Sequence, residues 1–473
     1  MRRPVDARSR PVLPWAGLVF RPSLRAGRAH PVLSEWRRLE DEQWLSPRVC
    51  AARHLARLGR TLHEALASVP YYRQRCAGQA ADVTSLRLPE DLARWPILSR
   101  AELTRHRTAL TARDVPDDGA VWNQTGGSTG TPVSFLQDDT YRTANLAATA
   151  RHDRWSGWEF GARCALLWGA DRDLAARRGW RERLATRWLR RQIELNAFDL
   201  SEARLAAFTR RMRGFRPQVV RGYAGALDLW AAWLETTSRP FPPPRGIISC
   251  AETLTETMRE RVSRIFESPI FDRYGSREFG LIASQCEAGS YHVNTRGVWV
   301  EILIGDRPAE PGETGRVVIT GLACRSMPLV RYDTGDVAEN VAESRCACGR
   351  GLPRMGRVCG RTSDFIVAPD GRRIHGEFFT HLFYGSRHVR EFTVAQEATG
   401  AIVVSVVGDG DGLAGEMETL VTAVRAHLGE RTEVVYRHVA ALPAAASGKR
   451  RFVSSARGAA SWSAETASPG ATR

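Results

Sequence analysis

Between residues 160 and 360, short apolar runs alternate with longer segments of helical periodicity. The runs, which include CALLWG (164–169), GIISC (246–250) and GRVVITGL (315–322), have the length of β-strands. Segments such as SEARLAAFTRRMRGF (201–215) place apolar residues at three- and four-residue spacing, as amphipathic helices do. This alternation predicts an α/β fold in which mixed sheets and helices form layers.

The regions on either side of this part have a different pattern. Residues from 34 to about 112 have mainly helical periodicity. After about residue 359, a strand, an Asp-Gly turn, two further strands and a helix predict a small α+β domain. We therefore expect a large N-terminal domain over 35–360 and a small C-terminal domain over 361–456. A disordered basic arm is expected at 1–34 and a disordered tail at 457–473.

Charge and cysteine content limit the possible partners and the compartment. The net charge of the 473 residues is +16, but arginines are spread singly among acidic residues, which indicates a solvated surface rather than nucleic-acid binding. Nine cysteines, an odd number in a long chain, do not predict a disulfide framework and favour a reducing cytoplasm. No run approaches the ~18 apolar residues of a membrane span. The oligomeric state stays open between a monomer and a homodimer.

A glycine-rich stretch, NQTGGSTGTPVSF (123–135), contains three glycines and five hydroxyl residues. Such a loop can direct backbone amides and hydroxyl groups toward a polyphosphate. It lacks the Gly-Lys-Ser/Thr ending of the common nucleotide-binding loop. The alternative is a Gly/Ser hairpin loop that binds no ligand.

Lys449 is the only lysine among the 68 lysine and arginine residues. It lies between Ser447-Gly448 and two arginines, in SGKRRFV (447–453). An ammonium group is a compact point charge, whereas a guanidinium group is a broad planar fork, so one cannot always replace the other. Lys449 is therefore either a functional residue or a chance survivor on a charged segment.

Five stretches in the same order resemble the motifs of the phenylacetate-coenzyme A ligase branch of the acyl- and aryl-adenylate-forming enzymes, which includes capsular-polysaccharide-associated relatives. The stretches are TGGSTGTP (125–132), YGSRE (274–278), RYDTGD (331–336), GRTSDF (360–365) and SGKRRFV (447–453). They resemble the family's phosphate loop, its Tyr-Gly-x-x-Glu, its Arg-Tyr-x-Thr-Gly-Asp, its interdomain hinge and its lysine motif. WPILSRAEL (95–103) also resembles that branch, and the resemblance covers roughly residues 36–455.

The resemblance implies an ATP-dependent carboxylic acid ligase with a mobile C-terminal domain. Such an enzyme forms an acyl adenylate from a small carboxylic acid and ATP, and then transfers the acyl group, with coenzyme A as the default acceptor. Phosphate contacts are implied for Thr125, Gly126, Gly127, Ser128, Thr129, Gly130 and Thr131.

The other motifs imply roles for single residues. Glu278 is implied as a Mg²⁺ ligand, since a hard oxygen donor suits that metal. Asp336 would accept hydrogen bonds from the ribose hydroxyls, and Tyr274, followed by Gly275, would stack on adenine. Arg361 would reach the nucleotide, with Asp364 as the pivot of the small domain. Lys449 would bridge the acid and the nucleotide during adenylation.

Each of these residues also has an ordinary structural interpretation. Glu278 could be a surface carboxylate, Asp336 a turn residue and Tyr274 a core residue. RGYAGAL (221–227) either lines the acyl pocket or forms a strand-to-helix turn. Two functional alternatives also remain: transfer of the acyl group to an amine or hydroxyl, and a catalytically silent protein that binds nucleotides or nucleic acid.

Three cysteines and one histidine have the composition of a structural zinc site. Cys286 and His292 lie six residues apart, and Cys346 and Cys348 form a tight Cys-x-Cys pair. One His with three Cys is a normal tetrahedral zinc set, and the alternative is a group of free buried thiols. Some members of the resembled branch bind structural zinc with a similar arrangement. All four positions would then be filled, so the metal would have a structural role.

Overall fold

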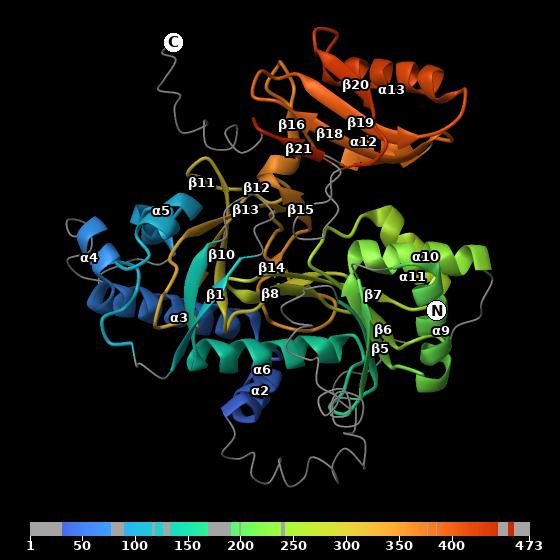
Figure 1. Cartoon of the computed structure of the whole chain (residues 1–473). Helices are drawn as coiled ribbons and strands as arrows, with labels where there is room; N and C mark the ends of the chain where they lie inside the picture. Colours follow the sequence, from blue (N-terminus) through green and yellow to red (C-terminus); the bar gives the residue numbers. More distant parts are fainter. Residues whose placement is uncertain are drawn as a thin grey trace, which may run out of the picture.

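A computed structural model describes most of the chain (Figure 1). The described residues are 31–76, 89–115, 119–125, 133–168, 191–197, 200–237, 242–375, 377–384, 386–442 and 453–457. The residues before 31, the tail after 457, Gly126–Thr131 and Lys449 lie outside this set, so the predictions made for them stay predictions.

Helices form the N-terminal region, as the periodicity predicts. They are α2 (Pro31–Glu42), α3 (Pro47–Ser68), α4 (Pro70–Arg75), the 3₁₀ helix η2 (Glu90–Arg94) and α5 (Arg100–Arg105). Helix α2 begins inside the stretch predicted to be a disordered arm. Proline suits the first turn of a helix, and Val32 and Trp36 pack against a buried cluster around Leu39. These apolar contacts explain why residues 31–34 are helical, contrary to the prediction of a disordered arm up to residue 34.

An eight-stranded sheet forms the centre of the large N-terminal part. Its strand order is β14-β9-β8-β7-β6-β5-β3-β4. In that order the strands are β14 (Arg354–Met355), β9 (Tyr291–Val293), β8 (Gly280–Gln285), β7 (Ile270–Ser276), β6 (Gly246–Cys250), β5 (Val219–Tyr223), β3 (Cys164–Trp168) and β4 (Gln192–Asn196). Strands β4, β3, β5, β6 and β7 are parallel, and β7, β8, β9 and β14 are antiparallel.

In the part of the chain that the structure describes, four helices pack around this sheet. Helices α9 (Glu202–Phe215), α10 (Ala224–Thr237) and α11 (Glu256–Phe266) share one apolar cluster with β5 and β6, centred on the fully buried Trp230. Helix α6 (Asp139–Trp155) contacts β8, and its Asp153 lies between Arg221 and Arg273 of the sheet. The mixed α/β layers predicted from the sequence are thereby confirmed.

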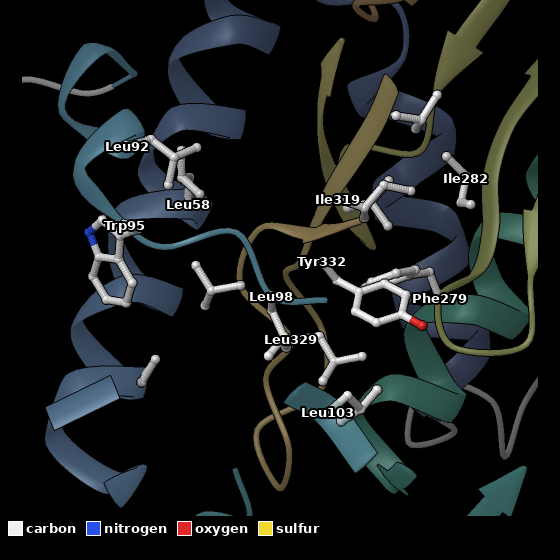
Figure 2. Close-up of a cluster of buried hydrophobic side chains, with 14 of the residues drawn as sticks. Leu58, Leu92, Trp95, Leu98, Leu103, Phe279, Ile282, Ile319, Leu329 and Tyr332 are labelled. Carbon is white, nitrogen blue, oxygen red and sulfur yellow. The ribbon is translucent and has the colours of Figure 1, made fainter. Parts of the chain in front are cut away.

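A second, five-stranded antiparallel sheet packs against the N-terminal helices. Its order is β11 (Arg307–Pro308), β10 (Val298–Ile304), β12 (Thr314–Gly321), β13 (Tyr332–Glu339) and β15 (Val358–Arg361). Figure 2 shows part of the shared core, with Leu58 and Trp95 on the helical side and Ile319 and Tyr332 on the sheet side. A separate hairpin, β1 (Ala120–Gln124) and β2 (Ser134–Asp138), flanks the glycine-rich stretch.

The C-terminal part has its own sheet and its own core. After the 3₁₀ helix η3 (Thr362–Asp364) come β16 (Phe365–Val367), β17 (Arg373–His375), α12 (Glu377–Tyr384), β18 (Val389–Gln396), β19 (Ile402–Gly408), α13 (Leu413–Leu428), β20 (Val434–His438) and β21 (Val453–Ser455). Strands β20, β19, β18 and β21 form one sheet, which packs with α12 and α13 (Figure 1). None of the helices in the described ranges is long and apolar enough to cross a membrane.

Candidate functional site

Three predicted nucleotide-binding residues meet where β7, β13 and β15 approach one another. The Tyr274 hydroxyl donates a hydrogen bond of 2.7 Å to Asp336 Oδ2. Asp336 pairs with Arg361 in the β13–β15 register, and Arg361 Nε lies 3.4 Å from Asp336 Oδ1. Burial raises the pKa of Asp336 to about 6, although Arg361 and the Tyr274 hydrogen bond oppose that rise. Each oxygen of the Asp336 carboxylate therefore has one partner and can accept a further hydrogen bond, as binding to ribose hydroxyls requires.

The backbone around these residues needs glycine at two positions. A Cβ on Gly275 would lie 2.5 Å from the Gly280 carbonyl oxygen, so this close approach excludes any larger residue. Gly335 has a φ of +72°, which turns the chain just before Asp336. Both glycines therefore fix the positions of the functional residues beside them.

Glu278, the predicted Mg²⁺ ligand, lies in the turn between β7 and β8. The Tyr332 hydroxyl lies 3.3 Å from Glu278 Oε1 and donates to it. Burial is the largest cause of the raised pKa of Tyr332, and the Glu278 charge is the next. The Tyr332 hydroxyl therefore stays protonated and can donate a hydrogen bond. The Glu278 charge is also one of the causes that raise the pKa of Asp336, after burial. A half-buried carboxylate oriented by one phenol fits a Mg²⁺ ion bound together with a nucleotide.

Thr125, the first residue of the predicted phosphate loop, pairs with Val133 at the loop end of the β1–β2 hairpin. Its backbone N–H donates to the Val133 carbonyl, and its Oγ1 accepts from the Val133 N–H, both at 3.0 Å. Arg100 Nη2 also donates to Thr125 Oγ1, at 3.1 Å. Arg100 is positioned because Leu98 forms a parallel β-bridge with Tyr332. A cation therefore lies at the start of the segment predicted to bind phosphates.

The RGYAGAL segment forms the turn from β5 into α10. Its Tyr223 ends β5, and its ring centroid lies 4.8 Å from that of Trp168 at the end of β3. Glu252 accepts the Gly225 N–H at 2.8 Å at the start of α10. The strand-to-helix turn is thereby observed, and a role in the acyl pocket stays a prediction.

The four predicted zinc ligands come together in one cluster. Their donor atoms all lie within 4.8 Å of one another. Cys286 Sγ lies 3.7 Å from Cys346 Sγ, and Cys348 Sγ lies 3.2 Å from His292 Nε2. His292 Nδ1 lies 3.1 Å from the Leu352 carbonyl oxygen, so Nδ1 carries the proton and Nε2 is free to ligate. Hydrogen bonding from Cys286 lowers the pKa of Cys348, which favours the thiolate that a metal requires.

Arg350 connects the loop that carries Cys346 and Cys348 to the segment just after α2. Its side chain is buried between two tryptophan rings, 4.8 Å from the Trp44 centroid and 4.5 Å from the Trp155 centroid. Its Nε donates to Gln43 Oε1 at 3.0 Å, and its Nη1 forms a 2.7 Å ion pair with Glu287. The Cys₃His cluster, which fits a tetrahedral metal without an open position, is therefore built into the protein interior.

Comparisons with known proteins give one matching domain model and several similar proteins. Residues 366–456 match the family model described as the CapK C-terminal domain. Protein CapK of Staphylococcus aureus is 23% identical over 264 residues, which cover 55% of this chain and 58% of CapK. Phenylacetate-coenzyme A ligase of Thermus thermophilus is 25% identical over 340 residues, which cover 66% of this chain and 70% of that ligase.

A solved structure extends the match to nearly the whole chain. The crystal structure of 2-hydroxyisobutyryl-CoA ligase in the postadenylation state, in complex with R3-HIB-AMP, has a TM-score of 0.67 and 17% identity, and covers 88% of this chain and 91% of its own. The chain is similar in sequence to CapK and to phenylacetate-coenzyme A ligases, and it has the fold of the solved acyl-CoA ligase. The resemblance seen in the sequence is thereby confirmed.

Sequence reasoning missed several residues of this candidate site. Arg100, Gln137 and Tyr332 each contact Thr125 or Glu278 or its turn. Tyr332 lies inside RYDTGD, and Arg100 lies inside WPILSRAEL, so these two motifs could have indicated both residues. Gln137 had no motif signal, because nothing in the sequence indicates that β2 and the β7–β8 turn meet.

Proposed function

We propose that this protein is an ATP-dependent carboxylic acid ligase that forms an acyl adenylate and transfers the acyl group to coenzyme A. The observation that carries the proposal is the group formed by Tyr274, Asp336 and Arg361 beside Glu278, in a chain with the adenylate-forming fold. The names of the relatives support it, since phenylacetate-CoA ligases join an acid to coenzyme A.

In the first step, a carboxylate oxygen of the acid attacks the α-phosphorus of ATP. The new O–P bond forms as the bond to the bridging α,β-oxygen breaks, and pyrophosphate leaves with that electron pair. Asp336 holds the ribose, and Arg361 beside it lies toward the nucleotide. Bound at Glu278, Mg²⁺ would neutralise phosphate charge. Thr125 and residues 126–131 would contact the phosphates, and Lys449 would bridge the acid and the nucleotide.

In the second step, the thiolate of coenzyme A attacks the acyl carbonyl carbon, and AMP leaves. We place the domain boundary at residues 360–361, with Asp364 as the pivot. Asp364 accepts the Arg361 N–H at 2.9 Å, which links the pivot to the nucleotide site. Rotation about this point withdraws Lys449 and admits the thiol.

Zn²⁺ is the metal that we propose for Cys286, His292, Cys346 and Cys348. It would supply a structural link and no chemistry, because all four positions are filled by protein. None of the nine cysteines, all of which lie in the described ranges, forms a disulfide, which suits a reducing cytoplasm, where we place the reaction.

The test is pyrophosphate release from Mg-ATP across a panel of aryl, arylacetic and fatty acids, with and without coenzyme A. We expect release to depend on one class of acid and a thioester to appear with coenzyme A. The CapK-type C-terminal domain favours a second candidate, transfer to an amine or hydroxyl. Acid-dependent release without a thioester would select that candidate. Absence of release with every acid would contradict both.

A further inference from the structure

The turn that carries Glu278 is held by a buried amide from another part of the chain. Gln137, in strand β2, is only 8% exposed. Its Nε2 donates to the carbonyl oxygens of Arg277, at 2.9 Å, and Glu278, at 3.2 Å. Because both partners are acceptors, the nitrogen and not the oxygen of the amide faces the turn.

The oxygen of the same amide accepts a hydrogen bond from strand β1, which precedes Thr125. Gln137 Oε1 accepts from Asn123 Nδ2 at 3.1 Å, and Asn123 Oδ1 accepts the Gln124 N–H at 2.8 Å. The orientation of both amides is thereby fixed, since each atom has a partner of the opposite kind. A continuous series of hydrogen bonds runs from the residue before Thr125 to the backbone of Glu278.

Helix α6, which follows β2 directly, holds the far end of the same turn. Asn145 Oδ1 accepts the Leu281 N–H at 2.9 Å. A Cβ on Gly280 would lie 2.2 Å from that oxygen, and Gly280 has a φ of +65°. The β2–α6 segment therefore fixes the Glu278 turn at its start through Gln137 and at its end through Asn145.

We propose that Gln137 is a positioning residue that fixes Glu278 relative to the phosphate-loop hairpin, so that the carboxylate is preorganised for the divalent metal of a bound nucleotide. The inference rests on the proposed function, in which Glu278 binds that metal. Neither a carboxylate nor a thioether at position 137 could donate to the two carbonyls. Loss of the two hydrogen bonds from Gln137 would free the turn, and the Glu278 side chain would then become ordered only when the metal binds.

The experiment measures metal binding on the full chain by electron paramagnetic resonance of Mn²⁺ in the presence of α,β-methylene-ATP. The variants are Gln137→Met and Gln137→Glu. The matched control is Gln124→Met, in the same hairpin, whose exposed side-chain amide donates to the Ser134 hydroxyl and not to the Glu278 turn in the described structure. We expect Mn²⁺ affinity to fall by at least ~10-fold in both Gln137 variants, as losses of supporting contacts at metal sites do, and to be unchanged in the control.

A double-mutant cycle separates positioning from a general structural effect. In a Glu278→Gln background, Gln137→Met is expected to cause little further loss of Mn²⁺ affinity, because the carboxylate that it positions is gone. If Gln137→Met does not fold, Asn123→Ala removes the other end of the series and is expected to weaken binding by ~3-fold. Wild-type affinity in every folded variant overturns the inference. A wild-type chain that neither binds Mn²⁺ with the analogue nor releases pyrophosphate contradicts the proposed function instead.

Discussion

The candidate nucleotide site and the candidate metal cluster, formed by Cys286, His292, Cys346 and Cys348, assemble side chains in opposite ways. Asp336 and Arg361 pair at 3.4 Å with side chains 14% and 41% exposed, so their polar atoms remain accessible to a ligand. The four atoms of the metal cluster lie within 4.8 Å of one another, and three of the four residues are buried. The first arrangement suits a ligand that comes and goes, and the second suits an ion that stays.

The two regions also differ in what supports them. The nucleotide residues come from strands of two sheets, so their geometry depends on how those sheets approach each other. Of the four candidate metal ligands, His292 lies in strand β9, Cys286 in the turn before it, and Cys346 and Cys348 in the loop before β14. Arg350, in that last loop, donates to Gln43 just after α2. We therefore expect substitutions in the first region to change catalysis and substitutions in the second to change stability.

Loss of the metal cluster is the change with the largest expected effect. Cys346→Ser should remove bound zinc and destabilise the fold by several kcal/mol, because the binding free energy of a structural metal contributes directly to folding. Zinc content by elemental analysis and a thermal melt measure this effect. Cys359→Ser, at a half-buried cysteine outside the cluster, is the control. Equal melting temperatures for both variants, with no zinc in the wild type, would contradict a metal site.

Glu278→Gln tests the other side of the comparison. We expect ATP–pyrophosphate exchange to fall by ~10²–10³, since a preorganised charge at the reacting phosphates is lost. The melting temperature should be unchanged, because the amide can still accept from Tyr332. A variant that melts lower while its folded fraction exchanges normally would show that Glu278 is structural and would remove the distinction between the two regions.

A smaller effect is expected when the hydroxyl that orients Glu278 is removed. Tyr332→Phe deletes the donor 3.3 Å from Glu278 Oε1 and should reduce exchange by ~10-fold, the value of one hydrogen bond to a charged group. The Mg²⁺ concentration for half-maximal exchange should rise as well. An unchanged rate and an unchanged Mg²⁺ requirement would mean that the carboxylate does not need this donor.

The smallest expected effect concerns pH. The ionised form of Asp336 accepts hydrogen bonds from ribose hydroxyls, and its pKa is about 6, so ligand affinity should fall as the pH drops below about 6. Adenosine is the suitable ligand, because it has no phosphate that titrates. Tyr274→Phe removes a hydrogen bond that stabilises the ionised form, so the midpoint should move to higher pH. Calorimetry measures both midpoints, and Asp336→Asn should bind independently of pH. A midpoint unaffected by either variant would exclude Asp336 as the titrating group.

The sequence predicted the α/β layers, the helical N-terminal region and the small C-terminal unit because each depends on local periodicity. It also grouped Cys286, His292, Cys346 and Cys348 as one candidate set, and the structure brings these four residues together, while the bound metal stays a prediction. It did not predict the contacts of Gln137 or Tyr332, which depend on the approach of strands that are far apart in the chain. The ion pair of Asp333 was not predicted either. Asp333, inside RYDTGD, lies 2.9 Å from Arg316 on the neighbouring strand β12, so its role is structural.

The central claim is that this chain activates a carboxylic acid with ATP and that its single lysine takes part. Pyrophosphate release measured for wild type, Lys449→Ala and Lys449→Arg with the preferred acid tests it most directly. We expect acid-dependent release in the wild type and a fall of ~10²–10³ in both variants, because a guanidinium cannot replace the ammonium. Release at the wild-type rate in both variants would contradict the claim.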